Sequence, residues 1–236
     1  MSTPNTTRWI GIGVMGLPLY GILTFWSSID PQPDPSTHLE AWSRFVTTNH
    51  YVLGHLLGSI LGLIFLIFGT FALGVYLATS RAGRLGLVAM VITVLGSALF
   101  LPLQGISTFS APKEGQAVLA GLEEYSKLPA IFADTVFGVT FLLVIVLQFV
   151  GNILLGVAVW RSGTLPRGAG ALWAAAPAIM YLSLVYAATI GPASTPPTVP
   201  AGAVLLVISG AWMAWSVLRR PSAAQAAGVQ GRPRVQ

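Results

Sequence analysis

Residues 51–78 read YVLGHLLGSILGLIFLIFGTFALGVYLA, a run of 28 residues without an aspartate, glutamate, lysine or arginine. A helix needs about 20 mostly apolar residues to cross a bilayer core of roughly 30 Å. The chain contains five further stretches of this kind, at about 9–28, 85–103, 135–160, 171–190 and 201–218. The sequence therefore predicts an all-α, polytopic transmembrane bundle of six helices, forming a single domain over residues 1–220.

The composition agrees with a membrane protein and excludes several other classes. Hydrophobic residues make up 54% of the chain and charged residues 8%, whereas soluble domains carry about 25% charged residues. The chain has no cysteine, which excludes a disulfide scaffold. Hydrocarbon offers the backbone no hydrogen-bond partners, so continuous apolar runs of this length are expected to be helical.

The charged residues predict the orientation of the bundle. Nine of the twelve basic residues fall in the N-terminus, the turns after the second and fourth spans, and the C-terminal tail, namely Arg8, Arg81, Arg84, Arg161, Arg167, Arg219, Arg220, Arg232 and Arg234. All seven acidic residues fall in the connections on the other side. Since positive residues are retained in the cytoplasm, both termini are predicted to be cytoplasmic.

The net charge of +5 follows from this asymmetry and predicts contact with anionic lipid. The lipid bilayer is thus the expected partner, with a second copy of the chain or another membrane protein as further candidates. Nucleic acid is not expected, because no basic face interleaved with aromatic residues is present. Without a P-loop, no nucleotide is expected either. Residues 221–236, rich in Ala, Gly, Gln and Pro, are predicted to form a disordered cytoplasmic tail.

The first apolar run has a second interpretation, as a cleaved signal peptide. It is about twice as long as a signal-peptide core and no clear cleavage site follows, so we interpret it as a retained helix. Gly11, Gly13 and Gly16 spell GxGxxG within it. The dinucleotide fingerprint needs a strand before this motif and a βαβ unit around it. We therefore predict that these glycines allow neighbouring helices to approach closely.

Two connections on the acidic side are long, at about 30–49 and 107–133. Alternate prolines open the first connection, after which Ser36 or Thr37 could cap a short helix. Apolar residues recur at helical spacing in both connections, which predicts interfacial helices lying on the outer leaflet. The alternative is a lid over an outward-facing pocket.

Small residues repeat on one face of the second span. Gly54, Gly58 and Gly62 form a double GxxxG pattern, which lets another helix backbone approach. Packing within the same chain is the simpler interpretation. Homodimerisation through this face is the alternative.

Polar residues mark two places in or beside the spans. His50, His55, Gln104 and Asp134 all map near the outer boundary of spans two to four and are candidates for a polar cluster. The two histidines are about 140° apart around a helix, a poor spacing for a shared metal. With no cysteine and no complete zinc or haem ligand set, we expect no metal and no cofactor.

Gln148 and Asn152 form the second polar place. They are four residues apart and so share a face of span four, with Gln148 near mid-depth. An amide there needs a partner inside the bundle, because lipid offers none. We expect an interhelical hydrogen bond, with a polar lining for a substrate or water path as the alternative.

The region from Tyr51 to Leu218 resembles a loose group of six-span bacterial inner-membrane proteins known mainly as domains of unknown function. A histidine near the start of span two, the turn RAGRLG at 81–86, and LGV at 155–157 followed by RSGTLPR at 161–167 carry this resemblance. It implies six-span topology in the bacterial inner membrane and no catalytic residue.

These observations favour a non-enzymatic membrane protein that binds an apolar small molecule or lipid, or that serves as a subunit of a membrane complex. The first alternative is a small membrane enzyme acting on a lipid or isoprenoid, with acid–base chemistry from Asp134, His50 or His55 at the outer face. A proton-coupled exporter is the weaker alternative, because no acidic residue lies within a predicted span.

Overall fold

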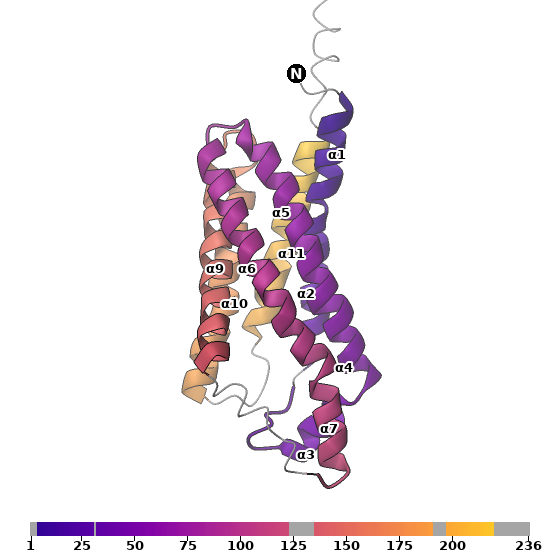
Figure 1. The fold of residues 1–236 in the computed structure, drawn as a ribbon. Helices are drawn as coiled ribbons and strands as arrows, with labels where there is room; N and C mark the ends of the chain where they lie inside the picture. Colours follow the sequence, from indigo (N-terminus) through magenta and orange to yellow (C-terminus); the bar gives the residue numbers. More distant parts are fainter. Residues whose placement is uncertain (1–3, 31, 123–134, 191–196, 220–236) are drawn as a thin grey trace, which may run out of the picture.

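The computed structural model describes residues 4–30, 32–122, 135–190 and 197–219, and every regular element within these ranges is a helix. The axes of the long helices are roughly aligned with one another (Figure 1). In chain order the elements are α1 (Pro4–Val14), α2 (Gly16–Ser28), α3 (Leu39–Val46), α4 (Asn49–Leu53), the π-helix η1 (Gly54–Leu61), α5 (Gly62–Ala78), α6 (Gly83–Phe109), α7 (Ala111–Leu119), α9 (Thr135–Arg161), α10 (Arg167–Ile190) and α11 (Thr198–Leu218).

The long helices close into a ring that follows their order along the chain. α2 packs against α5, α5 against α6, α6 against α9, α9 against α10, and α10 against α11, which returns to α2. α1 precedes α2, with Met15 between them, and contacts α5 and α11. Short turns link α5 to α6 and α9 to α10, so these neighbours run antiparallel, as in up-down bundles.

Five helical stretches are long and apolar enough to cross a membrane, namely Thr6–Ser28, Asn49–Ala78, Gly83–Leu119, Thr135–Arg161 and Thr198–Leu218. The predicted all-α fold is confirmed, and these helices suit a multi-pass membrane protein. The predicted span at 171–190 falls within α10, which occupies its place in the ring between α9 and α11.

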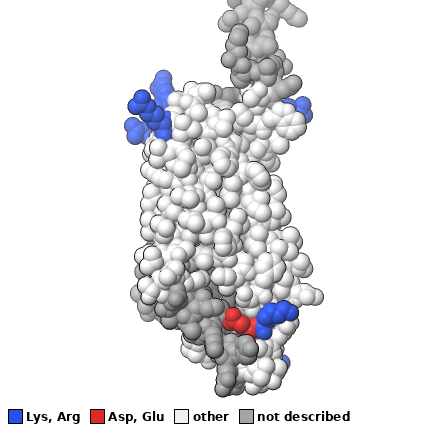
Figure 2. Space-filling model, viewed as in Figure 1, with Lys and Arg blue, Asp and Glu red and all other residues white. Residues whose placement is uncertain are grey.

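Charged side chains gather at the two ends of the bundle and leave its middle bare (Figure 2). One end, here called the basic end, holds the described residues Arg8, Arg81, Arg84, Arg161, Arg167 and Arg219. The opposite, acidic end holds all four described acids, Asp30, Asp34, Glu40 and Glu114, together with Arg44 and Lys113. The beginning of α1 and the end of α11 therefore lie at the same end of the bundle.

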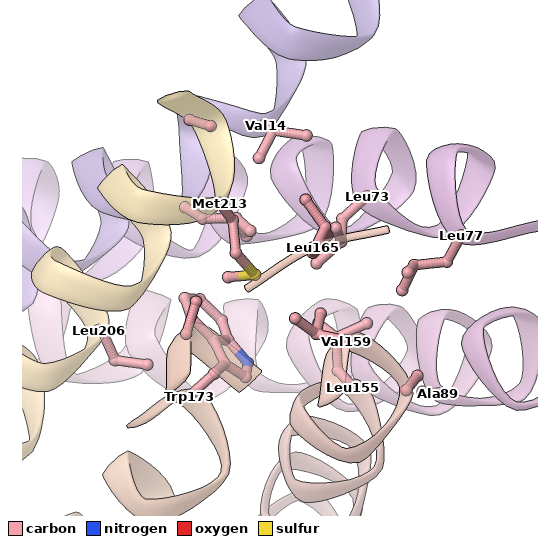
Figure 3. Close-up of a cluster of buried hydrophobic side chains, with 14 of the residues drawn as sticks. Val14, Leu73, Leu77, Ala89, Leu155, Val159, Leu165, Trp173, Leu206 and Met213 are labelled. Atoms are coloured by element: carbon pink, nitrogen blue, oxygen red, sulfur yellow. The ribbon is translucent and has the colours of Figure 1, made fainter. Parts of the chain in front are cut away.

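The main hydrophobic core occupies the half of the bundle nearer the basic end (Figure 3). Leu73 and Leu77 of α5, Leu155 of α9 and Met213 of α11 are fully buried there. Trp173 of α10 is the largest of the fully buried side chains. This core reaches the site described below, because Leu63 and Leu206 belong to the core and also line cavities.

Glycines of α1 and α2 allow these two helices to pack closely against α5 and α11. A Cβ on Gly16 would lie 2.5 Å from the Phe65 carbonyl oxygen of α5, and one on Gly13 would lie 2.7 Å from Ala72. A Cβ on Gly11 would meet Leu218 of α11 at 2.6 Å. The prediction that the GxGxxG glycines allow close helix approach is therefore confirmed. The same contacts fit a retained first helix.

The helix that contains the second span is not a continuous α-helix. Residues 54–61 form the π-helix η1, between α4 and α5. π-turns hydrogen-bond residue i to residue i+5, so the regular 100° step of the sequence-based helix does not hold there. Such turns are rare and occur frequently at functional sites. Apolar periodicity does not reveal them.

The three glycines of the GxxxG pattern differ in their surroundings. A Cβ on Gly58 would collide with the Ser27 side chain and lie 3.0 Å from the Leu23 carbonyl oxygen of α2, and one on Gly62 would lie 3.6 Å from Leu23. This face is thus turned toward α2 within the same chain. Gly54 has nothing within 4 Å of such a Cβ, so no neighbouring helix of the described chain approaches it closely, and its part in helix packing stays a prediction. Gly54 lines the cavity described below.

The packing of η1 on α2 generates the first prediction. Gly58→Ala should lower the free energy of unfolding by about 1–3 kcal/mol, because the added methyl group forces the two backbones apart. Gly54→Ala is the matched control in the same helix and should not destabilise the protein. Reversible unfolding in mixed micelles measures both. Equal stability of the two variants would contradict the assigned contact.

Candidate functional site

The helices of the two acidic-side connections pack against each other. Trp42 and Val46 of α3 join Tyr51 and Ala111 in a second, smaller core. A Cβ on Gly115 of α7 would lie 2.6 Å from Val46, so the two helices are in close contact. Trp42, one of the apolar residues of the first connection that were predicted to rest on lipid, is buried in this second core and so packs within the protein. In the second connection, Leu122 of the predicted apolar face is exposed, and α7 packs through Ala111 and Gly115 instead.

The turn before α3 is organised by Asp34. Its carboxylate accepts a hydrogen bond from the Ser36 backbone N–H at 2.9 Å and from the hydroxyls of Ser36 and Thr37. The backbone hydrogen bond, assisted by the hydroxyl groups, holds the pKa of Asp34 below its ordinary value against the opposing effect of burial. His38 occupies the N-cap position. The predicted Ser36 or Thr37 cap is therefore wrong, because both hydroxyls are engaged by Asp34.

A cavity of about 380 Å³ lies in the acidic half of the bundle. Its lining comes from α2, α4, η1, α5, α6, α10 and α11, with Phe45 of α3 also contributing. Four of the lining residues, Gly54, His55, Gly58 and Ser59, belong to η1. The π-helix therefore forms part of the cavity wall.

Three of the four residues predicted as an outer polar cluster line this cavity. They are His50, His55 and Gln104. The fourth, Asp134, lies outside the described residues. The His55 ring lies against the Tyr51 ring with centroids 4.1 Å apart, and its Nδ1 is 3.1 Å from the Tyr51 carbonyl oxygen. This hydrogen bond leaves Nε2 of His55 as the ring nitrogen available to a ligand.

His50 has an acidic partner that sequence reasoning did not find. Its Nε2 lies 2.5 Å from Oδ2 of Asp30, and both residues line the cavity. The Trp26 ring meets the His50 ring edge-on, with centroids 6.1 Å apart. Both side chains of the pair are about half exposed. Asp30 lies 20 residues before His50 at the end of the first span, and nothing in the local pattern of either residue signals the pairing.

A second cavity of about 210 Å³ lies deeper, toward the middle of the bundle. Both predicted intramembrane amides, Gln148 and Asn152, line it, and the rest of its lining is mostly apolar or aromatic. The two cavities share Tyr20, Phe100, Met180 and Val199 and so are adjacent. Together they form a site with a polar outer part and an apolar inner part.

The two amides also connect three helices. Gln148 Nε2 donates to the Ser97 hydroxyl of α6 at 3.2 Å, and Asn152 Nδ2 donates to the Gln148 carbonyl oxygen at 2.8 Å. The Trp173 ring nitrogen of α10 donates to Asn152 Oδ1 at 3.2 Å. The structure therefore contains both arrangements considered from the sequence, an interhelical hydrogen-bond network and a polar surface on a cavity. The partners of the amides, Ser97 and Trp173, could not be identified from helical spacing alone.

The described residues contain no group of three histidine or acidic side chains that could hold a metal ion. The site is instead an elongated, amphipathic space with one histidine–carboxylate pair. No protein family, curated protein or solved structure matches the chain.

The amide network generates the second prediction. Asn152→Leu should lower the free energy of unfolding by about 1–2 kcal/mol, because it leaves the buried Trp173 N–H without an acceptor. In a cycle with Trp173→Phe, the two losses should be less than additive. Unfolding in mixed micelles measures each variant and the double variant. Strictly additive losses would show that the hydrogen bond contributes nothing.

Proposed function

We propose that this protein is a non-enzymatic membrane protein that binds a lipid or another apolar, chain-like small molecule between its helices. The observation that carries this proposal is the pair of adjoining cavities, polar at the acidic end and apolar toward the middle of the bundle. Ligand sites in helical bundles lie between helices and are mostly apolar, with a few polar groups that orient the ligand. The larger cavity, of about 380 Å³, falls in the usual range of roughly 300–1,000 Å³ for such sites, and the smaller one, of about 210 Å³, adjoins it.

We further propose six membrane spans with both termini in the cytoplasm of a bacterium. α10 would be the sixth span, since it packs between two apolar helices of the ring. The arginine-rich basic end would face the cytoplasm, following the positive-inside rule. The cavity at the acidic end would then open toward the outer leaflet, from which lipid could enter.

A second candidate function is a small membrane enzyme acting on a lipid or isoprenoid. The His50–Asp30 contact favours it, because a carboxylate beside an imidazole orients the ring and supports its action as a general base. The pair lines the same cavity and would act on the polar end of a bound molecule. A ligand recovered chemically unchanged after prolonged incubation with the protein would favour binding over turnover.

The proposed topology is tested by cysteine labelling, since the chain has no cysteine of its own. We expect Gln116→Cys and Pro197→Cys to react with a membrane-impermeant maleimide on intact cells. Thr79→Cys, in the turn after α5, should react only after the cells are permeabilised. Protection of Pro197→Cys in intact cells would mean that α10 does not cross the membrane. The reverse labelling of all three would invert the orientation.

Ligand binding is tested by filling the cavity at a position without close neighbours. Gly54→Leu should abolish the stoichiometric lipid-like molecule expected to copurify with the wild-type protein, because the new side chain occupies the cavity. Gly105→Leu is the matched control: it also has nothing within 4 Å of an added Cβ, and Gly105 does not line either cavity. Mass spectrometry of the purified proteins measures the bound molecule. Retention of that molecule by Gly54→Leu, or only bulk lipid in the wild type, would overturn the proposal.

A further inference from the structure

We infer that the ligand of this site carries a positively charged head, as a lipophilic amine or quaternary ammonium compound does. This inference rests on the proposed function and specifies the chemical class of the molecule bound. It comes from the charges and aromatic rings of the larger cavity.

The described lining of the larger cavity contains one acidic side chain, Asp30, and no lysine or arginine. Arg44, the described arginine at this end of the bundle, is exposed and pairs with Glu40 at 2.6 Å. A phosphate or carboxylate head would thus face Asp30 without any group of permanent positive charge to balance it. A cationic head would instead gain from the same carboxylate, whose Oδ2 also contacts His50.

Aromatic side chains line the same cavity as this carboxylate. They include Trp26, Phe45 and Tyr51. Trp26 lies against His50, the partner of Asp30, and the Phe45 and Tyr51 rings are 5.6 Å apart. The faces of such rings attract cations, and quaternary ammonium groups are recognised in this way by groups of aromatic side chains.

The deeper cavity would hold the apolar chain of the ligand. Phe141, Val144 and Leu206 give it an apolar lining, and Tyr20 and Phe100 join it to the larger cavity. An alkyl chain that enters through the larger cavity is therefore removed from water as its head reaches Asp30. The ligand is expected to be amphipathic, with the cationic head at the acidic end and the chain toward the middle of the bundle.

Three probes with the same alkyl chain test this inference: decyltrimethylammonium, decanol and decyl sulfate. Each is titrated calorimetrically into the full-length protein in lipid nanodiscs, with empty nanodiscs giving its partition into lipid. We expect decyltrimethylammonium to bind most tightly and decyl sulfate least tightly. Asp30→Asn should weaken decyltrimethylammonium about tenfold while changing decanol by less than about twofold. Glu40→Gln, which removes an exposed acid at the same end outside the cavity, should leave all three affinities unchanged.

A second variant separates a charge effect from a loss of folding. Gln32 lines the cavity, and Gln32→Lys should weaken decyltrimethylammonium and strengthen decyl sulfate. Equal or tighter binding of decyl sulfate by the wild type would overturn the inference about charge while leaving lipid binding intact. If none of the three probes binds the protein more than it partitions into empty nanodiscs, both this inference and the proposed function are wrong.

Discussion

The backbone of this protein has to satisfy its own hydrogen bonds, because the hydrocarbon of a membrane supplies no partners. The long helices follow from this constraint. The uncharged middle of the face shown in Figure 2 follows from a second one, the cost of placing a charged side chain in hydrocarbon. Helices that lack a hydrophobic driving force between them associate through close packing and a few polar contacts. Gly16 and Gly58 provide such packing against neighbouring backbones, and Gln148 and Asn152 provide the polar contacts.

The bundle is solid in one half and hollow in the other. Leucines, Met213 and Trp173 fill the half near the basic end, whereas the acidic half contains the two adjoining cavities. Two glycines of η1, both in the acidic half, have opposite consequences. At Gly58 the missing side chain brings helices together, and at Gly54, one helical turn away, it leaves space that a ligand can occupy. The second small core of α3 and α7 lies at the same acidic end as these cavities, and Phe45, which packs against it, also lines the larger cavity.

The polar residues of the site differ in how far they could be predicted. His50, His55 and Gln104 were expected near one another because each falls at the outer end of a predicted span, and all three line the larger cavity. Asp30 was not expected to pair with His50, since the contact depends on how α2 packs against η1 and α5. The π-turns at 54–61 were also unforeseen, because the sequence of this apolar run does not distinguish i to i+5 from i to i+4 hydrogen bonding.

The sequence by itself determined the helical fold, the approximate helix limits and the separation of basic from acidic ends, because these depend on local apolar length and on charge counts along the chain. Only the tertiary structure decided which helix faces meet, and therefore which polar residues share a space. Asn152 shows the difference: its need for a partner is evident from its position in an apolar run, but its acceptance of a hydrogen bond from Trp173 depends on how α9 and α10 pack. Helical spacing relates residues on one helix, whereas a site between helices depends on the rotation and crossing of each helix against its neighbours.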